Sequence, residues 1–390
     1  MNLKHLLGNV FRDTIDSVCI FKGHRREIRK FKSPKRKAIY NTVTLSREQA
    51  LAVDRLFEEN YGKKVPHTWH RHFTAFTGKF DVNYFPELLY IPEFERYMNL
   101  KKEYVKVLSD KNVLPYLALT AEVAMPKTLF SCASGLICGS KKGEILSLGQ
   151  LVEALSNLGE AFIKPSVDSD SGRGCAVVHF SNGVDTVSGL DVESLIKNYG
   201  NNWVIQERVV CHECISRLYP NSVNTFRIIT YRWRDEICHM PAIMRIGQGG
   251  KNIDNAHAGG VFIAVDDDGR LHEKAFTEFK SEYTEHPDTG IKFKDYLIPQ
   301  FPLVIEAAKK CHAFIPQLGV VNWDFTIDRS GQPVLIEANT AGGSIWLLQM
   351  AHGCGAFGDK TPEVLRWLKL MRKTTRKEKA TYAFGNFPDN

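Results

Sequence analysis

The chain has 390 residues, 43% hydrophobic and 24% charged, which is typical of a soluble globular protein with room for two or three domains. No apolar run reaches the roughly 18 residues that a membrane-spanning helix needs, and the N-terminus has no signal-peptide pattern, so we expect a cytoplasmic protein. The nine cysteines are scattered and odd in number, which favours reduced thiols over a disulfide framework.

The net charge of +7 is concentrated at the two ends of the chain. Residues 1–40 carry 11 Lys and Arg against 3 acids, and residues 366–379 carry 7 against 1. A nucleic-acid binder would show a basic stripe with interleaved aromatic residues on its folded body, so we expect no nucleic-acid partner. Basic ends suit either peripheral contact with the anionic inner face of a membrane or simple solvation. We expect residues 371–390 to form a mobile basic tail.

Two segments precede the part of the chain that carries the chemistry. Residues 1–40 form a basic amphipathic segment, with a helix predicted at 2–20 and a polybasic run behind it. The helix binds the cytoplasmic leaflet or packs on the protein's own core, and the sequence leaves both open. Residues 41–105 are predicted to form a helical domain rich in aromatic residues, which starts at a capping box of Ser46 and Gln49.

A candidate phosphate site lies in residues 106–205, where Lys164 ends a short strand before the Ser/Gly loop 165–174. The ammonium group can pair with phosphate oxygens as a compact charge. Small residues such as Ser171 and Gly172 let the loop fold over the phosphates and offer backbone N–H groups. This is not a Walker A loop, and an ordinary Ser/Gly hairpin is the alternative. We also predict a helix at residues 106–120.

Two arginines are predicted inside strands of the next stretch, residues 206–370. Arg227 lies in a strand that forms a hairpin with residues 237–246, and Arg245 lies in the second arm. With a turn at residues 234–236, Arg227 falls roughly opposite Met244 and Arg245. A guanidinium group inside a strand needs an anionic partner such as phosphate or a carboxylate.

A second hairpin, near the C-terminal end, carries the most specific pattern. If Ile327 pairs with Val334 across the turn, then Asp324 faces Glu337, and Asn339 shares the face of Glu337. Two carboxylates and an amide oxygen suit Mg²⁺, with Mn²⁺ as an alternative. The competing interpretation is a polar outer face on an edge hairpin.

The spacing from Asp324 to Glu337-Ala338-Asn339 resembles the metal-binding end of the ATP-grasp superfamily. With Gly342-Gly343 behind it and Asn224-Thr225-Phe226-Arg227 upstream, the chain is most similar to the sugar-transfer-associated ATP-grasp proteins, over roughly residues 105–365. The resemblance implies an α+β fold in which two lobes, 106–205 and 206–370, hold the nucleotide. A mainly helical N-terminal region stands where many members have a parallel-sheet domain.

The resemblance also implies roles for individual residues. Asn255, in the polar Gly-rich loop 249–260, would contact substrate and phosphate, and Arg227 and Arg245 would stabilise the transferring group. The residues implied to bind ATP through its phosphates, adenine or ribose are Lys111, Lys164, Ser171, Gly172, Gln206, Glu207, Val209 and Glu213. The implied metal ligands are Asp324, Glu337 and Asn339.

The activity implied by this resemblance is ATP- and Mg²⁺-dependent ligation of a carboxylate to an amine through an acyl phosphate. The small-molecule substrates would be sugar-linked or amino-acid-like, in the synthesis or modification of a surface glycan or a related metabolite. A kinase that phosphorylates a hydroxyl or sugar acceptor is the alternative. A third class is a nucleotide-binding protein without turnover, recruited to a membrane by its basic ends.

Overall fold

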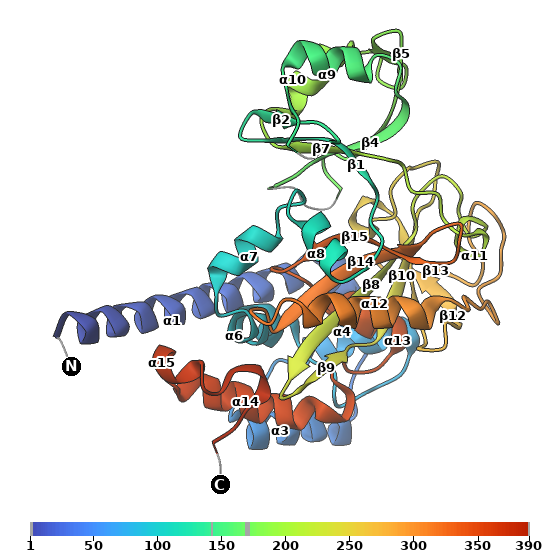
Figure 1. The fold of residues 1–390 in the computed structure, drawn as a ribbon. Coiled ribbons are helices and arrows are strands. Elements are labelled where there is room, and N and C mark those ends of the chain that lie inside the picture. Colours follow the sequence, from blue (N-terminus) through green and yellow to red (C-terminus); the bar gives the residue numbers. More distant parts are fainter. Residues whose placement is uncertain (1–2, 142, 168–171, 389–390) are drawn as a thin grey trace.

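A computed structural model describes residues 3–141, 143–167 and 172–388. Figure 1 shows a small lobe that stands apart from a larger body, with helices and antiparallel sheet in both. The expected α+β class is therefore confirmed. No helix in the described part of the chain combines the length and the apolar character needed to cross a membrane.

The small lobe is built on one antiparallel sheet. In the described residues its strand order is β3-β2-β1-β7-β4-β5-β6. Two helices, α9 (Leu148–Leu155) and α10 (Val192–Tyr199), share a hydrophobic core with this sheet. The strands are β1 (Thr128–Ala133), β2 (Leu136–Cys138), β3 (Ile145–Leu146), β4 (Gly159–Pro165), β5 (Ala176–Ser181), β6 (Val184–Asp185) and β7 (Trp203–Gln206).

The body is built on a larger antiparallel sheet. In the described residues its order is β13-β12-β11-β10-β8-β14-β15, and β9 pairs with β8. The strands are β8 (Thr225–Trp233), β9 (Glu236–His239), β10 (Ala242–Ile246), β11 (Val261–Val265), β12 (Leu271–Phe276), β13 (Glu282–Tyr283), β14 (Val320–Ile327) and β15 (Pro333–Asn339).

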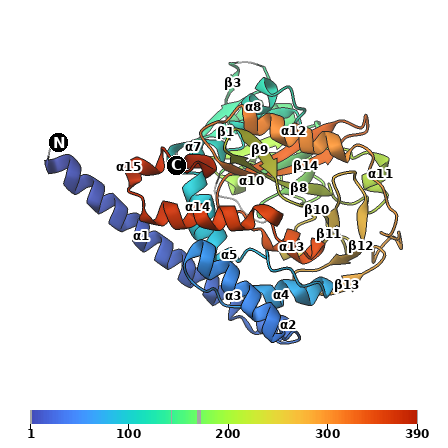
Figure 2. The same cartoon turned by 90° about the horizontal axis from the view of Figure 1, so that it is seen from below.

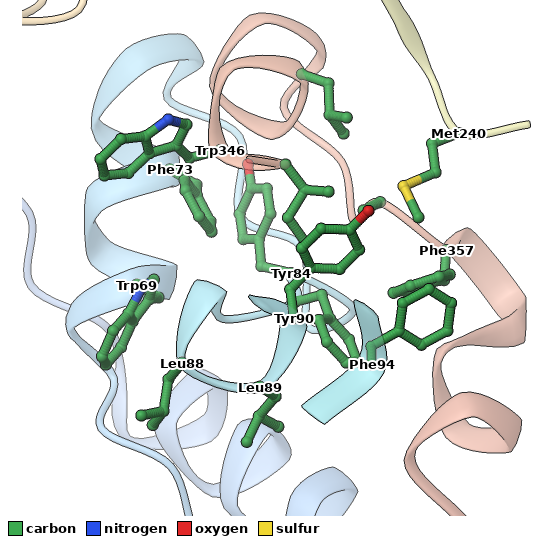
Figure 3. Close-up of a cluster of buried hydrophobic side chains, with 14 of the residues drawn as sticks. Trp69, Phe73, Tyr84, Leu88, Leu89, Tyr90, Phe94, Met240, Trp346 and Phe357 are labelled. Carbon is green, nitrogen blue, oxygen red and sulfur yellow. The ribbon is translucent and has the colours of Figure 1, made fainter. Parts of the chain in front are cut away.

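Helices cover both faces of the larger sheet, which explains why its central strands are almost continuously apolar. One face packs on α12 (Phe301–Ala313). The other shares one hydrophobic core with α3 (Arg47–Tyr61), α4 (Thr68–Thr77), α13 (Trp346–His352) and α14 (Thr361–Lys373). Figure 3 shows part of this core, to which the N-terminal segments contribute Trp69, Phe73 and Tyr90, and the C-terminal part of the chain contributes Trp346 and Phe357.

The N-terminal helix is longer than the sequence predicted. It runs from Leu3 to Phe31 as α1 and is followed by α2 (Pro34–Tyr40), while Figure 2 shows its first turns extending beyond the body. No residue that stops a helix occurs before Ser33-Pro34. The buried Glu27, 3.0 Å from the ammonium group of Lys30, compensates part of the basic charge. This second half of α1 therefore packs on the protein.

Two further expectations were wrong. The helix expected at 106–120 is split into α7 (Lys102–Leu108) and α8 (Leu114–Thr120), because the Asp110 carboxylate accepts the Asn112 N–H at 2.9 Å and holds a turn.

The tail expected to be mobile folds back on the body in its described part. There α15 (Arg376–Lys379) is followed by Tyr382, whose carbonyl accepts the indole N–H of Trp367 at 2.7 Å. The apolar side chains of this segment pack on the core and hold it. The confirmed features include the capping box at Ser46.

Candidate functional site

A pocket with a cavity volume of about 360 Å³ lies between the two sheets. The volume lies within the range of small-molecule sites. Strands β4 and β7 of the small lobe and β8, β10, β14 and β15 of the body all contribute to its wall. Most of the residues singled out in the sequence line it: Lys111, Lys164, Gly172, Gln206, Glu207, Val209, Arg227, Arg245, Asn255, Asp324, Glu337 and Asn339.

Two of the candidate residues are not placed in this wall. Glu213 is exposed at the start of α11 (Glu213–Ser216), because the chain turns away after β7 and bridges to the tip of the β14–β15 hairpin at Cys211. Ser171 lies outside the described residues. The neighbouring Gly172 lines the pocket with a φ of +74°, a conformation that favours glycine.

Lys164 is a buried cation that faces this pocket from the end of β4. Its side chain is 5% exposed, and its ammonium group lies 3.5 Å from the Ile336 carbonyl. Within the described residues it forms no ion pair. Burial lowers the pKa of Lys164 below its ordinary value, and the more distant Glu337 offsets this only in part. A cation held in this way is stabilised when an anion enters the pocket.

Lys111 approaches the same region from the turn between α7 and α8. Its backbone N–H donates to the Ser166 carbonyl at 2.9 Å, which ties this turn to the loop after β4. Its ammonium group lies 3.1 Å from a Glu337 carboxylate oxygen. The lysine is therefore held at the junction of the two lobes, beside one of the candidate metal ligands.

The β14–β15 hairpin brings Asp324 opposite Glu337, although by a register different from the one expected. Ile327 pairs with Pro333 instead of Val334, and a bulge leaves Ile336 unpaired. The extra residue restores the Asp324–Glu337 pairing and turns the Ile336 carbonyl toward Lys164. Bulges of this kind commonly redirect side chains at functional sites.

Asp324 is the anionic centre of the site and is 3% exposed. It accepts two hydrogen bonds from Arg227, at 2.6 and 3.0 Å, and lies 3.2 Å from a guanidinium nitrogen of Arg245. Burial would raise the pKa of Asp324, but the two arginine charges outweigh it and keep the pKa below its ordinary value. Its partner Arg245 also contacts the Thr225 hydroxyl at 2.6 Å.

The register of β8 and β10 explains how both arginines reach one carboxylate. Arg227 lies directly across from Asp324 on one side and from Ile243 on the other, so the pairing with Met244 or Arg245 expected from the turn was wrong. Arg245 pairs with Thr225, two residues from Arg227 and on the same face. The hairpin is interrupted at Pro241 between β9 and β10, which shifts the register.

The donor set matches the preferences of Mg²⁺ in kind. Asp324, Glu337 and Asn339 present two carboxylates and one amide, and the Asn339 side chain lies 3.4 Å from Asp324. Each carboxylate has a cationic neighbour, with Arg227 and Arg245 on Asp324 and Lys111 on Glu337. Glu337, whose side chain is 31% exposed, is the more accessible of the two.

The wall at the end of β7 has polar groups that differ in whether the protein already uses them. The Gln206 amide donates to the Pro126 carbonyl and the Thr128 hydroxyl, each at 3.3 Å, so its N–H groups already have partners within the protein. The N–H of Glu207 donates to the Lys127 carbonyl at 2.9 Å. In the described part of the chain, the backbone groups of Val209 have no hydrogen-bond partner, which leaves them open to a ligand.

Sequence reasoning missed two buried acids that hold the loop after β15. The Glu95 carboxylate accepts the N–H groups of Gly342 and Gly343 at 2.8 and 2.9 Å, and Glu87 accepts the Ile345 N–H at 3.4 Å. Burial raises the pKa of Glu95 to about 7 and that of Glu87 to about 8. Gly342 and Gly343 line the pocket, so the N-terminal helices help to shape its wall. Nothing in the local sequence marks either glutamate.

Comparisons with solved structures give weak similarities. VanG D-Ala:D-Ser ligase from Enterococcus faecalis is 15% identical with a TM-score of 0.40, over 67% of this chain and 62% of that one. D-alanine–D-alanine ligase from Bacillus anthracis, complexed with ATP, is 13% identical with a TM-score of 0.39, over 68% of each chain. Carboxyaminoimidazole ribonucleotide synthase from Aspergillus clavatus, complexed with ATP, is 11% identical with a TM-score of 0.35. That match covers 61% of this chain and 46% of the synthase, so the chain spans about half of the synthase's length.

A search of curated proteins finds no match. The comparison with protein families, in contrast, gives a match that covers most of the chain. The family described as sugar-transfer associated ATP-grasp matches residues 91–363, which include both sheets and almost every pocket residue discussed above. The chain therefore belongs to the sugar-transfer associated ATP-grasp family and has an ATP-grasp fold.

Proposed function

We propose that this protein is an ATP-dependent ligase that joins a carboxylate to an amine through an acyl phosphate. The observation that carries the proposal is the buried ammonium group of Lys164, which faces a cavity of about 360 Å³ and forms no ion pair among the described residues. The same cavity is also lined by a second lysine, three arginines and four carboxylates: Lys111, Arg208, Arg227, Arg245, Glu207, Asp254, Asp324 and Glu337. A phosphate chain would satisfy this arrangement of charges.

In this proposal each group of pocket residues has its own role. Lys164 and Lys111 bind phosphate oxygens as point charges, and the backbone at Val209 receives the adenine. Arg227 and Arg245 stabilise the negative charge that develops on the transferred phosphoryl group. Mg²⁺, or Mn²⁺, held by Asp324, Glu337 and Asn339 would neutralise charge on the bridging phosphate oxygens. Asn255 contacts the substrate from the Gly-rich loop.

The acceptor chemistry separates the ligase from the kinase alternative. A ligase makes an acyl phosphate, a reactive mixed anhydride that hydroxylamine converts into a hydroxamate. A kinase makes a stable phosphate ester of a hydroxyl group or sugar. The substrates that we propose are sugar-linked or amino-acid-like small molecules used in building a surface glycan or a related metabolite.

The experiment is a screen of ADP release with ATP and Mg²⁺ against amino acids and sugar acids, alone and in pairs. Each reaction is repeated with hydroxylamine, and hydroxamates are sought by mass spectrometry. ADP release that needs a carboxylate, with hydroxamate formed, supports the ligase. A stable phosphorylated alcohol without hydroxamate would replace the ligase with the kinase.

We further propose that the exposed apolar side chains of α1 let the protein contact the inner face of a membrane. Within residues 15–21 some apolar side chains are exposed beside a basic run, although Ile20 packs on the core and Asp16 pairs with Arg96. This combination suits an anionic lipid surface. The exposed apolar side chains are Ile15, Val18 and Phe21.

A further inference from the structure

A histidine in the pocket wall is held by a relay that spans distant parts of the chain. His257 lies in the short 3-10 helix Ala256–Ala258, and its Nδ1 is 2.5 Å from a Glu278 carboxylate oxygen. The other oxygen of Glu278 accepts a hydrogen bond from Arg36 of α2 at 2.6 Å. The Arg36 guanidinium lies 4.2 Å from the ring centroid of Trp346, which also lines the pocket.

These contacts fix which nitrogen of the imidazole is free to accept a proton. Because the carboxylate of Glu278 can only accept while it is ionised, Nδ1 carries the hydrogen, and in the neutral imidazole Nε2 is the nitrogen with the lone pair. Burial would raise the pKa of Glu278, but its hydrogen bond with His257 and the charge of Arg36 lower it, so the group stays ionised. The His257 side chain is 51% exposed and lines the pocket.

The relay differs from the ordinary surface pairs of histidine and carboxylate in this protein. His272 lies 2.9 Å from Asp266, but that carboxylate is 51% exposed and neither residue lines the pocket. Glu278, in contrast, is 8% exposed and is held by an arginine 242 positions away in the sequence. A buried carboxylate with a partner on each oxygen gives the imidazole one orientation.

We propose that His257 is the general base that takes a proton from the amine substrate, and that Glu278 and Arg36 position it. This proposal rests on the ligase function proposed above. The amine arrives as an ammonium ion, whose nitrogen has no lone pair for attack. Loss of one proton to Nε2 of His257 frees that lone pair, as in other sites where an oriented histidine activates a nucleophile.

The step then balances without any further reagent. The amine nitrogen bonds to the carbonyl carbon of the acyl phosphate, and the bond from that carbon to the phosphate oxygen breaks. The second proton of the nitrogen leaves with the phosphate as HPO₄²⁻, and the amide remains. The proton on His257 returns to solvent through the open side of the pocket.

A reaction with hydroxylamine distinguishes deprotonation of the amine by His257 from the earlier steps, which are ATP binding and formation of the acyl phosphate. It is a weak base, largely unprotonated at neutral pH, so it attacks an acyl phosphate without help from a base. In His257→Ala, the rate with the amine identified in the screen should fall by about 10²-fold or more. Hydroxamate formation from the same carboxylate should stay at the wild-type rate. Imidazole added to the buffer should restore part of the amine reaction.

Two further variants complete the test. Glu278→Gln removes the charge that orients the ring, so it should slow the amine reaction less than His257→Ala does and again spare the hydroxamate. His272→Gln, in the pair with Asp266 outside the pocket, is the matched control and should change neither rate. ATP binding measured by calorimetry checks that each variant keeps the nucleotide site.

The outcomes distinguish this proposal from the function on which it rests. If the wild-type protein forms no hydroxamate with any carboxylate, the ligase function fails and this proposal fails with it. If it forms hydroxamate but His257→Ala uses the amine at the normal rate, only the role of His257 is refuted. Equal losses of the amide and hydroxamate products would also refute it, since His257 would then act before the amine arrives.

Discussion

Replacing Lys164 with methionine should change nucleotide affinity and protein stability in opposite directions. Methionine has a similar length and is apolar, so it fits the buried end of β4. In the free protein Lys164 is 5% exposed and forms no ion pair among the described residues, so removal of its ammonium group relieves a desolvation cost. In the complex the same change removes a charged contact to phosphate.

The expected size of each effect follows from these contacts. A hydrogen bond to a charged group contributes about 1.5–3 kcal/mol, so ATP should bind about 10- to 150-fold more weakly to Lys164→Met. AMP should lose less, because it lacks the β- and γ-phosphates. The free energy of unfolding without nucleotide should stay constant or rise by about 1 kcal/mol.

The pH dependence of stability and of ATP binding gives an independent check on the role of Lys164. Its folded-state pKa lies below the ordinary value of 10.5, so the unfolded chain binds more protons between the two values. Between these two pKa values Lys164 makes the free energy of unfolding rise with pH, and this contribution should vanish in Lys164→Met. ATP binding by the wild type should weaken as pH rises through the lowered pKa, because the ammonium charge is lost.

Isothermal titration calorimetry with ATP and AMP and urea unfolding across pH would measure both quantities. Lys197→Met is a matched control, because Lys197 is an exposed lysine of the same lobe, paired with Glu193 on α10. Equal losses of affinity for ATP and AMP would refute the phosphate contact. A large loss of stability without nucleotide would show that the ammonium group already has a partner.

Other substitutions test the remaining parts of the site. Glu337→Ala should abolish Mg²⁺-dependent ADP release with little change in stability, because its partly exposed pair with Lys111 contributes about 0–1 kcal/mol; normal ADP release would exclude a metal role. Asp324→Ala should lower the free energy of unfolding by about 3–5 kcal/mol in urea titrations, because Arg227 and Arg245 lose their buried partner. Glu87→Gln should flatten the loss of stability that we expect as pH rises from 4.5 through 8, since burial raises the pKa of Glu87 to about 8; unchanged pH slopes would contradict this. Serine at the exposed apolar positions of α1, which are Ile15, Val18 and Phe21, should abolish binding to anionic vesicles at low salt without changing turnover. A wild-type protein that does not bind such vesicles would refute the membrane contact.

A shorter test of the membrane contact, deletion of residues 1–37, is unsuitable for a structural reason. Phe31 is part of the main hydrophobic core, and Arg36 pairs with the buried Glu278. The deletion would therefore disturb the body and the pocket wall as well as the exposed part of α1. Substitutions at exposed positions separate these effects.

The sequence alone was sufficient wherever the controlling contacts are local. The bounds of strand β11, Val261–Val265, follow from local sequence, because an apolar β-branched run there ends at an Asp/Gly turn. The capping box at Ser46 forms because both of its partners lie within one helical turn. The sequence also places Asp324 and Glu337 on the two arms of one hairpin, although their direct pairing depends on the bulge at Ile336.

Tertiary structure decided the features that depend on distant residues. The bulge at Ile336 corrects a register that turn position alone gets wrong by one residue, and it directs the Ile336 carbonyl toward Lys164 from the other lobe. Helices at the start of the chain supply Glu95 to the loop after β15 and Arg36 to Glu278. These pairs are separated by more than 200 positions, so no periodicity or spacing indicates them.

The physical reason is that local sequence signals report which backbone conformation a segment prefers, whereas a site depends on which segments meet. Lys164, Asp324 and Glu337 could each be singled out because their neighbours in sequence are unusual. Whether a buried charge has no ion pair, one oppositely charged partner or several depends on groups that only folding brings near. The sequence therefore determined the elements and the family of this protein, and the packing of the N-terminal helices against the larger sheet decided the shape and charge of its pocket.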